Sequence, residues 1–117
     1  MAEIKEEQLL PVGSVVYLKE GTLKVVILAR GQLMAEKLGK QIYYDYLGGI
    51  YPQGFSMDNS YNFNNEQIER IVFKGYEDEE EERYRTVVKE WKMKHKEEYN
   101  IEKSGNSSLG IGDTNDN

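Results

Sequence analysis

Few residues in this sequence have side chains suited to acid–base chemistry, and their spacing does not bring them together. The single histidine is His95, and it has no second histidine and no cysteine with which to share a metal ion. Asp45 could form a carboxylate pair only with the distant Glu66 or Glu69, and no serine stands in a G-x-S-x-G motif. We therefore expect a packed, structural His95 and no catalytic residue.

Six acidic residues follow one another at positions 77–82, a composition that calcium sites share. In a helix, however, consecutive carboxylates point around the axis instead of converging on one ion, and no Asp-x-Asp-x-Asp-Gly loop is present. The glycines at 48, 49 and 54 form no G-x-G-x-x-G pattern, and no phosphate-binding lysine follows them. The sequence thus predicts no metal ion and no cofactor.

The length and charge of the chain favour a small single-domain protein that neither binds nucleic acid nor spans a membrane. The chain has 117 residues, which is enough for one domain with a modest core. Its net charge of −6 disfavours nucleic-acid binding, because neutralising phosphates requires clustered Lys and Arg. No apolar run is long enough to span a membrane, and the first residues lack the pattern of a signal peptide. Since cysteine is also absent, we expect a cytoplasmic protein.

The order of polar and apolar residues predicts four short strands before position 76. Period-two alternation places them at about 14–19, 23–30, 41–47 and 70–75. The first two should form a hairpin around Glu20-Gly21, with Gly21 free to take positive φ. The third should end at Gly48-Gly49, and the turn-rich stretch after it should hold one helical turn capped by Asn64 or Asn65.

A long helix is predicted at about 78–98, where helix formers continue without glycine or proline. Acidic residues at its start and basic residues in its second half complement the helix dipole. The apolar stripe of this helix consists of Tyr84, Val88, Trp91 and His95, with Val87 beside them.

These elements predict an α+β fold: a small bent antiparallel sheet of about four strands, with the long C-terminal helix packed across it or extending from it. Residues 1–8 should be a flexible N-terminus, and 9–99 should form the single domain. Residues 100–117 are rich in Gly, Ser, Asn and Asp and should be a disordered tail.

Five of the nine tyrosines gather around the third predicted strand and its exit. Consecutive strand residues point to opposite faces, so Tyr43 and Tyr44 cannot both enter one core. An outward tyrosine either packs beneath another element or offers a partner a large ring with a polar tip. The residues that we expect to bind a partner are Tyr44, Tyr46, Tyr51, Pro52, Phe55 and Trp91.

Three separated blocks of the sequence resemble the domain of unknown function 4176 family, small proteins of Gram-positive bacteria. The blocks are Leu10-Pro11 with Gly13-Ser14-Val15, Tyr44-Asp45-Tyr46 with Tyr51-Pro52 and Gly54, and Phe63-Asn64 with Ile71, Phe73, Gly75 and Tyr76. The resemblance covers about residues 9–84. Members are typically encoded beside type VIIb secretion genes and LXG-type toxins. This implies a non-enzymatic chaperone, adaptor or targeting factor for a secreted effector, and it brings no catalytic residues.

The expected partner is a protein, namely a secreted toxin or its targeting helices. No W-x-G turn is present, since Lys92 and Met93 follow Trp91, so we expect a helper that stays inside the cell. Two alternatives stay open: an immunity or regulatory protein that binds a toxin's catalytic domain, and a small hydrolase that uses Asp45 or His95. Whether the chain forms a homodimer is also left open.

Overall fold

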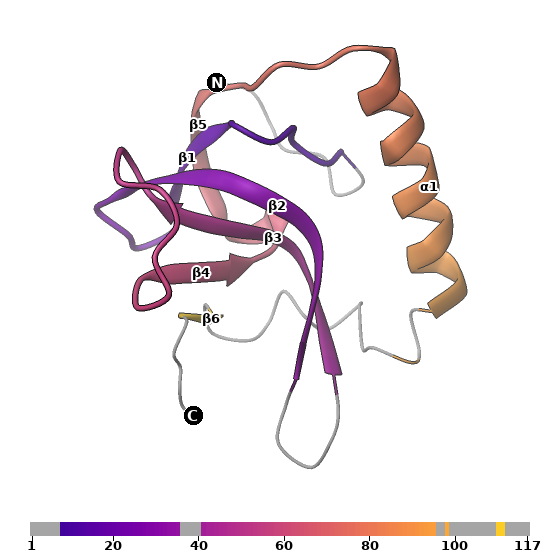
Figure 1. Ribbon diagram of the computed structural model, residues 1–117, viewed down its shortest axis with the longest axis horizontal. Helices are drawn as coiled ribbons and strands as arrows, with labels where there is room; N and C mark the ends of the chain where they lie inside the picture. Colours follow the sequence, from indigo (N-terminus) through magenta and orange to yellow (C-terminus); the bar gives the residue numbers. More distant parts are fainter. Residues whose placement is uncertain (1–7, 36–40, 96–97, 99–109, 112–117) are drawn as a thin grey trace.

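The structure, a computed structural model, describes residues 8–35, 41–95, 98 and 110–111. The strands form one antiparallel sheet in the order β5-β1-β2-β3-β4-β6. The sheet curls, and the helix stands beside it (Figure 1), which confirms the predicted α+β fold. The elements are β1 (Val15–Leu18), β2 (Lys24–Ala35), β3 (Gln41–Ile50), β4 (Ser60–Phe63), β5 (Ile68–Phe73), α1 (Glu79–His95) and β6 (Gly110–Ile111).

The sheet has five strands of at least four residues, and the two-residue β6 is added at its edge. The prediction of about four strands missed β4, because serine and asparagine favour turns when read locally. Pairing with β3 overrides that preference, since Ser60 lies opposite Gly49 and Phe63 lies opposite Tyr46. The strands β2 and β3 are also longer than predicted, because their ladder continues to the Ala35–Gln41 pair.

Two glycines lie inside β3 instead of ending it. A Cβ at Gly48 would lie 2.5 Å from Val25 Cγ1, and one at Gly49 would lie 2.3 Å from the carbonyl oxygen of Gly54. Neither approach is sterically possible for a larger residue, so both glycines are required by close packing. In the β1–β2 turn, the prediction placed positive φ at Gly21, whereas in the structure Glu20 has positive φ (65°).

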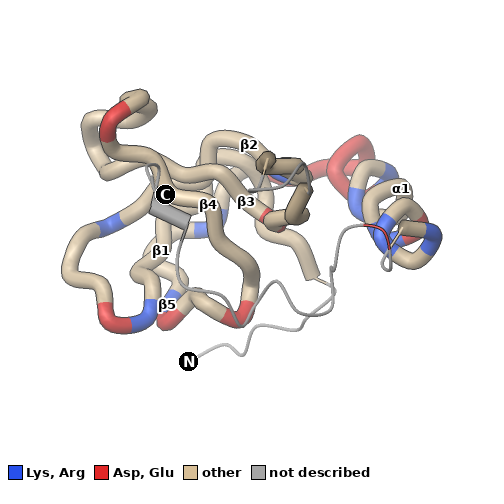
Figure 2. The backbone as a smooth tube through the Cα atoms, turned by 90° about the horizontal axis from the view of Figure 1, so that it is seen from below, with Lys and Arg blue, Asp and Glu red and all other residues tan. Residues whose placement is uncertain are grey.

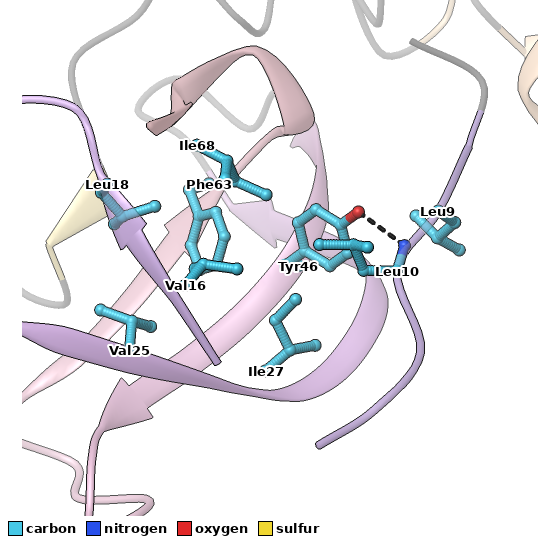
Figure 3. Close-up of a cluster of buried hydrophobic side chains, with 9 residues drawn as sticks. All are labelled: Leu9, Leu10, Val16, Leu18, Val25, Ile27, Tyr46, Phe63 and Ile68. Atoms are coloured by element: carbon cyan, nitrogen blue, oxygen red, sulfur yellow. Dashed lines mark hydrogen bonds between the residues drawn. The ribbon is translucent and has the colours of Figure 1, made fainter. Parts of the chain in front are cut away.

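The curled sheet encloses the hydrophobic core, and the segment before β1 closes it (Figure 3). Leu10 donates its backbone N–H to the Tyr46 hydroxyl at 2.8 Å, and that hydroxyl donates to Asn65 Oδ1. The segment is therefore held by hydrogen bonds as well as by apolar packing. The core side chains are Leu9, Leu10, Val16, Leu18, Val25, Ile27, Tyr46, Phe63 and Ile68.

The helix α1 begins where Asp78 Oδ1 accepts the backbone N–H groups of Glu80 (3.0 Å) and Glu81 (3.2 Å). Its first turn is acidic and its later turns carry lysine and arginine (Figure 2). The predicted helix of 78–98 agrees with the observed range of α1, Glu79–His95, and positions 96–97 lie outside the described residues.

Charged side chains attach α1 to the rest of the protein. Glu81 accepts hydrogen bonds from both terminal nitrogens of Arg30, one of them at 2.9 Å. Arg85 Nε donates to the Leu9 carbonyl at 2.8 Å. Val88 of the predicted apolar stripe packs against the core, whereas Val87, which lies beside the stripe, is 61% exposed. The face of the helix toward the rest of the protein therefore includes polar residues: Glu81 and Lys92 reach the strands β2 and β3, and Arg85 reaches the segment before β1.

The predicted flexible segment 1–8 and the predicted tail 100–117 lie outside the described residues, apart from Gln8 and the two residues of β6. Within the part of the chain that is described, no helix combines the length and the apolar character needed to cross a membrane.

Candidate functional site

The tyrosines of β3 are packing residues. Tyr46 is 0% exposed and packs against Phe63 with ring centroids 5.2 Å apart, while Tyr43 and Tyr44 are also buried. Tyr43 lies 5.6 Å from the Trp91 ring, so one side of the strand meets α1. The expectation that Tyr44 and Tyr46 offer their rings to a partner is therefore wrong. The physical reason is that β3 is a central strand of a sheet that curls around its own core.

Burial also changes the acidity of two of these tyrosines. Removal from water raises the pKa of Tyr43 and of Tyr46 far above the ordinary value of 10.0, and the nearby Asp45 carboxylate raises the Tyr43 pKa further. A raised pKa means that the neutral hydroxyl is the form that the folded protein favours. Burial of these two neutral tyrosines contributes to stability in full below pH 10, and this contribution is lost as the pH rises above that value.

In an alkaline titration, we expect Tyr43 and Tyr46 to stay protonated until the protein unfolds. Tyrosinate absorbance should therefore show a late phase that coincides with the loss of the far-ultraviolet circular dichroism signal. The variant Tyr46→Phe should remove part of that late phase. A single early phase, completed while the circular dichroism signal is still native, would contradict the assignment.

Asp45 and His95, the residues of the hydrolase alternative, are both engaged in contacts within the fold. Lys92 Nζ lies 3.0 Å from Asp45 Oδ1, and Asn65 donates its N–H to Asp45 Oδ2 at 3.0 Å. His95 Nδ1 lies 2.9 Å from the Trp91 carbonyl, and the two rings stack. Asp45 therefore anchors α1 to β3. No group of three or more His, Asp or Glu suited to a metal ion occurs among the residues described.

A groove of about 340 Å³ lies on the outer face of the sheet, over β5, β1 and β2. The register places Val15 beside both Val26 and Phe73, whereas the neighbouring Val16 points into the core. Phe73 is 60% exposed, so a large apolar ring is open to water. The groove is lined by Gly13, Val15, Lys24, Val26, Tyr51, Val72 and Phe73.

The remaining predicted partner-binding residues divide between two places. Tyr51 lines the groove and is 46% exposed. Pro52 and Phe55 follow it in the exposed turn after β3, and Phe55 is 57% exposed. Trp91 lies on α1, half-buried, with its ring against those of Tyr43 of β3 and His95. Tyr51, Pro52 and Phe55 thus lie close together in the chain at the end of β3, and Trp91 lies apart from them on α1.

Sequence reasoning did not select Val15, Val26 and Phe73 as functional residues. The alternation in β1 does predict that Val15 and Val16 point to opposite faces of the sheet, and this was the sequence feature that could have indicated an outward Val15. In β5, however, the pairing with β1 is irregular between Val15 and Val16, and this shift sets Phe73 opposite Val15. A bulge of this kind cannot be read from the spacing of apolar residues.

Comparison with curated proteins and with solved structures finds no match to the chain. A family model, described as a domain of unknown function (DUF4176), matches residues 9–84. The matched range runs from the first core leucine through β5 to the first half of α1, so it contains all residues that line the groove. The chain therefore belongs to the DUF4176 family.

Proposed function

We propose that this protein is a non-enzymatic accessory protein, an adaptor or chaperone, for an LXG-type toxin of a type VIIb secretion system. The class of partner is the one that the family resemblance implies. The observation that carries the proposal is the apolar groove on the outer face of the sheet, with Phe73 and Tyr51 open to water at its sides. Exposed aromatic rings beside an apolar floor are typical of the centre of a protein interface.

The groove has neighbours that enlarge the apolar surface. Val12 precedes the groove residue Gly13 and is exposed, and Val72 is an exposed residue of the groove itself. The turn after β3, which follows the groove residue Tyr51 in sequence, carries Phe55 and Met57, both exposed. A stable interface buries about 800 Å² on each partner, which is more than a groove of this size supplies. We therefore place the groove at the centre of the contact and the turn at its rim.

The proposal predicts that the protein co-purifies with an LXG-type toxin encoded beside it. Phe73→Ala and Tyr51→Ala should each weaken that binding by about tenfold or more, as truncation of a central aromatic residue does. Phe73 is 60% exposed and Tyr51 is 46% exposed, so the thermal midpoint should change little. Binding is measured by titration with purified toxin, and folding by circular dichroism.

Val87→Ala is the matched control, because Val87 is an exposed apolar residue on α1 and not in the groove. It should leave binding unchanged. Loss of binding in the Val87 variant, with no loss in the Phe73 variant, would move the contact to the helix and refute the groove. Toxin truncations decide the role: an accessory protein should need the amino-terminal targeting half. A requirement for the carboxyl-terminal catalytic half would instead identify an immunity protein.

A further inference from the structure

Two rows of side chains run across the strands on the outer face, and the first alternates cations with aromatic rings. The register places Tyr17 of β1 opposite both Arg70 of β5 and Lys24 of β2. Tyr51 continues this row, since its backbone N–H donates to the Lys24 carbonyl at 2.9 Å. The Arg70 guanidinium lies 4.5 Å from the Tyr17 ring centre, and Lys24 Nζ lies 5.2 Å from that of Tyr51.

The second row is apolar and lies beside the first. It consists of Phe73, Val15 and Val26, which are opposite one another on β5, β1 and β2. Gly49 ends the row on β3, where the Gly54 backbone covers the position that a side chain would take. Lys24 and Tyr51 of the first row line the groove, and Tyr17 and Arg70 extend that row beyond its lining. The groove therefore has an apolar floor along the second row and, along the first, a positively charged rim formed by Lys24 and Arg70.

The cations of this rim have no carboxylate partner among the residues that the structure describes. Arg70 and Lys24 contact aromatic rings, which compensate a positive charge only in part. The protein as a whole is acidic, with 21 acidic and 15 basic residues, so an unpaired cation beside an apolar groove runs against its average charge. Arg30, Lys74, Arg85 and Lys92 have carboxylates within ion-pair distance, whereas Lys19, Arg83, Lys89 and Lys94 have none among the described residues. What distinguishes Lys24 and Arg70 is therefore their place beside the apolar row.

The edge of the sheet next to the groove is poorly suited to binding an extended segment. The pairing of β5 with β1 is irregular at two places, between Val15 and Val16 and between Tyr17 and Leu18. Bulges of this kind twist an edge strand and interrupt the regular hydrogen-bond ladder that an added strand requires. The occupant of the groove therefore lies on the face of the sheet and not along its edge.

A helix laid across the strands fits the two rows. Four neighbouring strand positions span about 14 Å, at a spacing of about 4.8 Å. This length equals roughly two and a half helical turns, at about 5.4 Å per turn. The apolar stripe of such a helix would cover Phe73, Val15 and Val26. Residues on one flank of the stripe would reach Lys24 and Arg70.

We propose that the groove binds an amphipathic helix whose apolar stripe is flanked on one side by Asp or Glu, with the carboxylates pairing with Lys24 and Arg70. This inference rests on the proposed function and names the chemistry of the partner segment. The net charge of −6 by itself would favour a basic partner. The consecutive acidic residues, however, belong to positions 77–82 before and within α1, outside the groove.

The test uses two synthetic helical peptides with the same leucine stripe, one flanked by glutamate and the other by lysine. In fluorescence anisotropy titrations, the glutamate peptide should bind about tenfold more tightly than the lysine peptide. The double variant Lys24→Glu/Arg70→Glu should reverse this preference. Phe73→Ala should weaken both peptides. The matched control Lys89→Glu/Lys94→Glu, which makes the same charge change on α1, should preserve the preference for glutamate.

The inference would be overturned if the protein bound the glutamate and lysine peptides equally well. It would also be overturned if the α1 control variant reversed the preference for the glutamate peptide as the groove variant does. The same variants tested with the toxin separate this inference from the proposed function. If toxin binding falls with Phe73→Ala and is insensitive to Lys24→Glu/Arg70→Glu, the accessory function holds and the acidic helix is refuted. If the toxin does not bind at all, the proposed function fails, and the peptide preference still decides what the groove accepts.

Discussion

Replacing Tyr46 with alanine is expected to lower the free energy of unfolding by about 3–5 kcal/mol, the cost of removing a large buried aromatic side chain. Tyr46 is fully buried against Phe63, and its hydroxyl links the Leu10 N–H to Asn65 Oδ1. A small domain has a total stability of about 5–15 kcal/mol, so this loss would leave it marginal. Urea unfolding followed by circular dichroism measures the change.

Two further variants separate the contributions of this residue. Tyr46→Phe keeps the ring and removes the hydroxyl, which takes away the acceptor of the buried Leu10 N–H at a cost of about 1–3 kcal/mol. Tyr51→Ala removes an exposed tyrosine and should cost less than about 1 kcal/mol. If Tyr46→Ala were as stable as Tyr51→Ala, the buried position of Tyr46 would be refuted.

Breaking the ion pair between Arg30 and Glu81 should have an effect of similar size. Both side chains are 9% exposed, and both terminal nitrogens of Arg30 donate to the Glu81 carboxylate. Glu81→Gln leaves the buried guanidinium without its counter-charge, which typically costs about 3–5 kcal/mol. Arg30 still donates to the Leu10 carbonyl at 2.9 Å and contacts the Tyr84 ring, so we expect a value near the lower end.

The double variant Arg30→Met/Glu81→Leu is the control for this prediction. It removes both charges, so it should recover much of the stability that Glu81→Gln loses. Fluorescence of Trp91 reports on the attachment of the helix, since that ring lies against Tyr43 of β3. A double variant less stable than Glu81→Gln would show that apolar packing cannot replace the ion pair at this site.

The elements that the sequence predicts well are those with a local cause. The helix α1 follows from its uninterrupted helix formers and from Asp78, which caps its first turn. The strands β1 and β2 follow from alternating β-branched residues. The single helical turn at Asn65–Gln67 is also confirmed, because Asn64 and Gln67 bond each other's backbone N–H groups within four residues.

The features that the sequence could not predict depend on partners far along the chain. The strand β4 exists because β3 pairs with it, in spite of the turn preference of its serine and asparagine. Arg30 and Glu81 are 51 positions apart, so no local pattern relates them. Of the predicted contact residues, Tyr51 reaches the groove because it follows the end of β3, whereas Tyr44 and Tyr46 lie within the strand and are buried.

The short segment before β1 has a consequence for synthesis of the chain. The carbonyl and N–H of Leu10 are bound by Arg30 and Tyr46, which follow 20 and 36 positions later. The Leu9 carbonyl is bound by Arg85, 76 positions later. A ribosome releases a protein from its amino end, so these leucines emerge before the residues that bind them. Nascent chains of this protein therefore cannot complete their interior until almost all of the domain has left the exit tunnel.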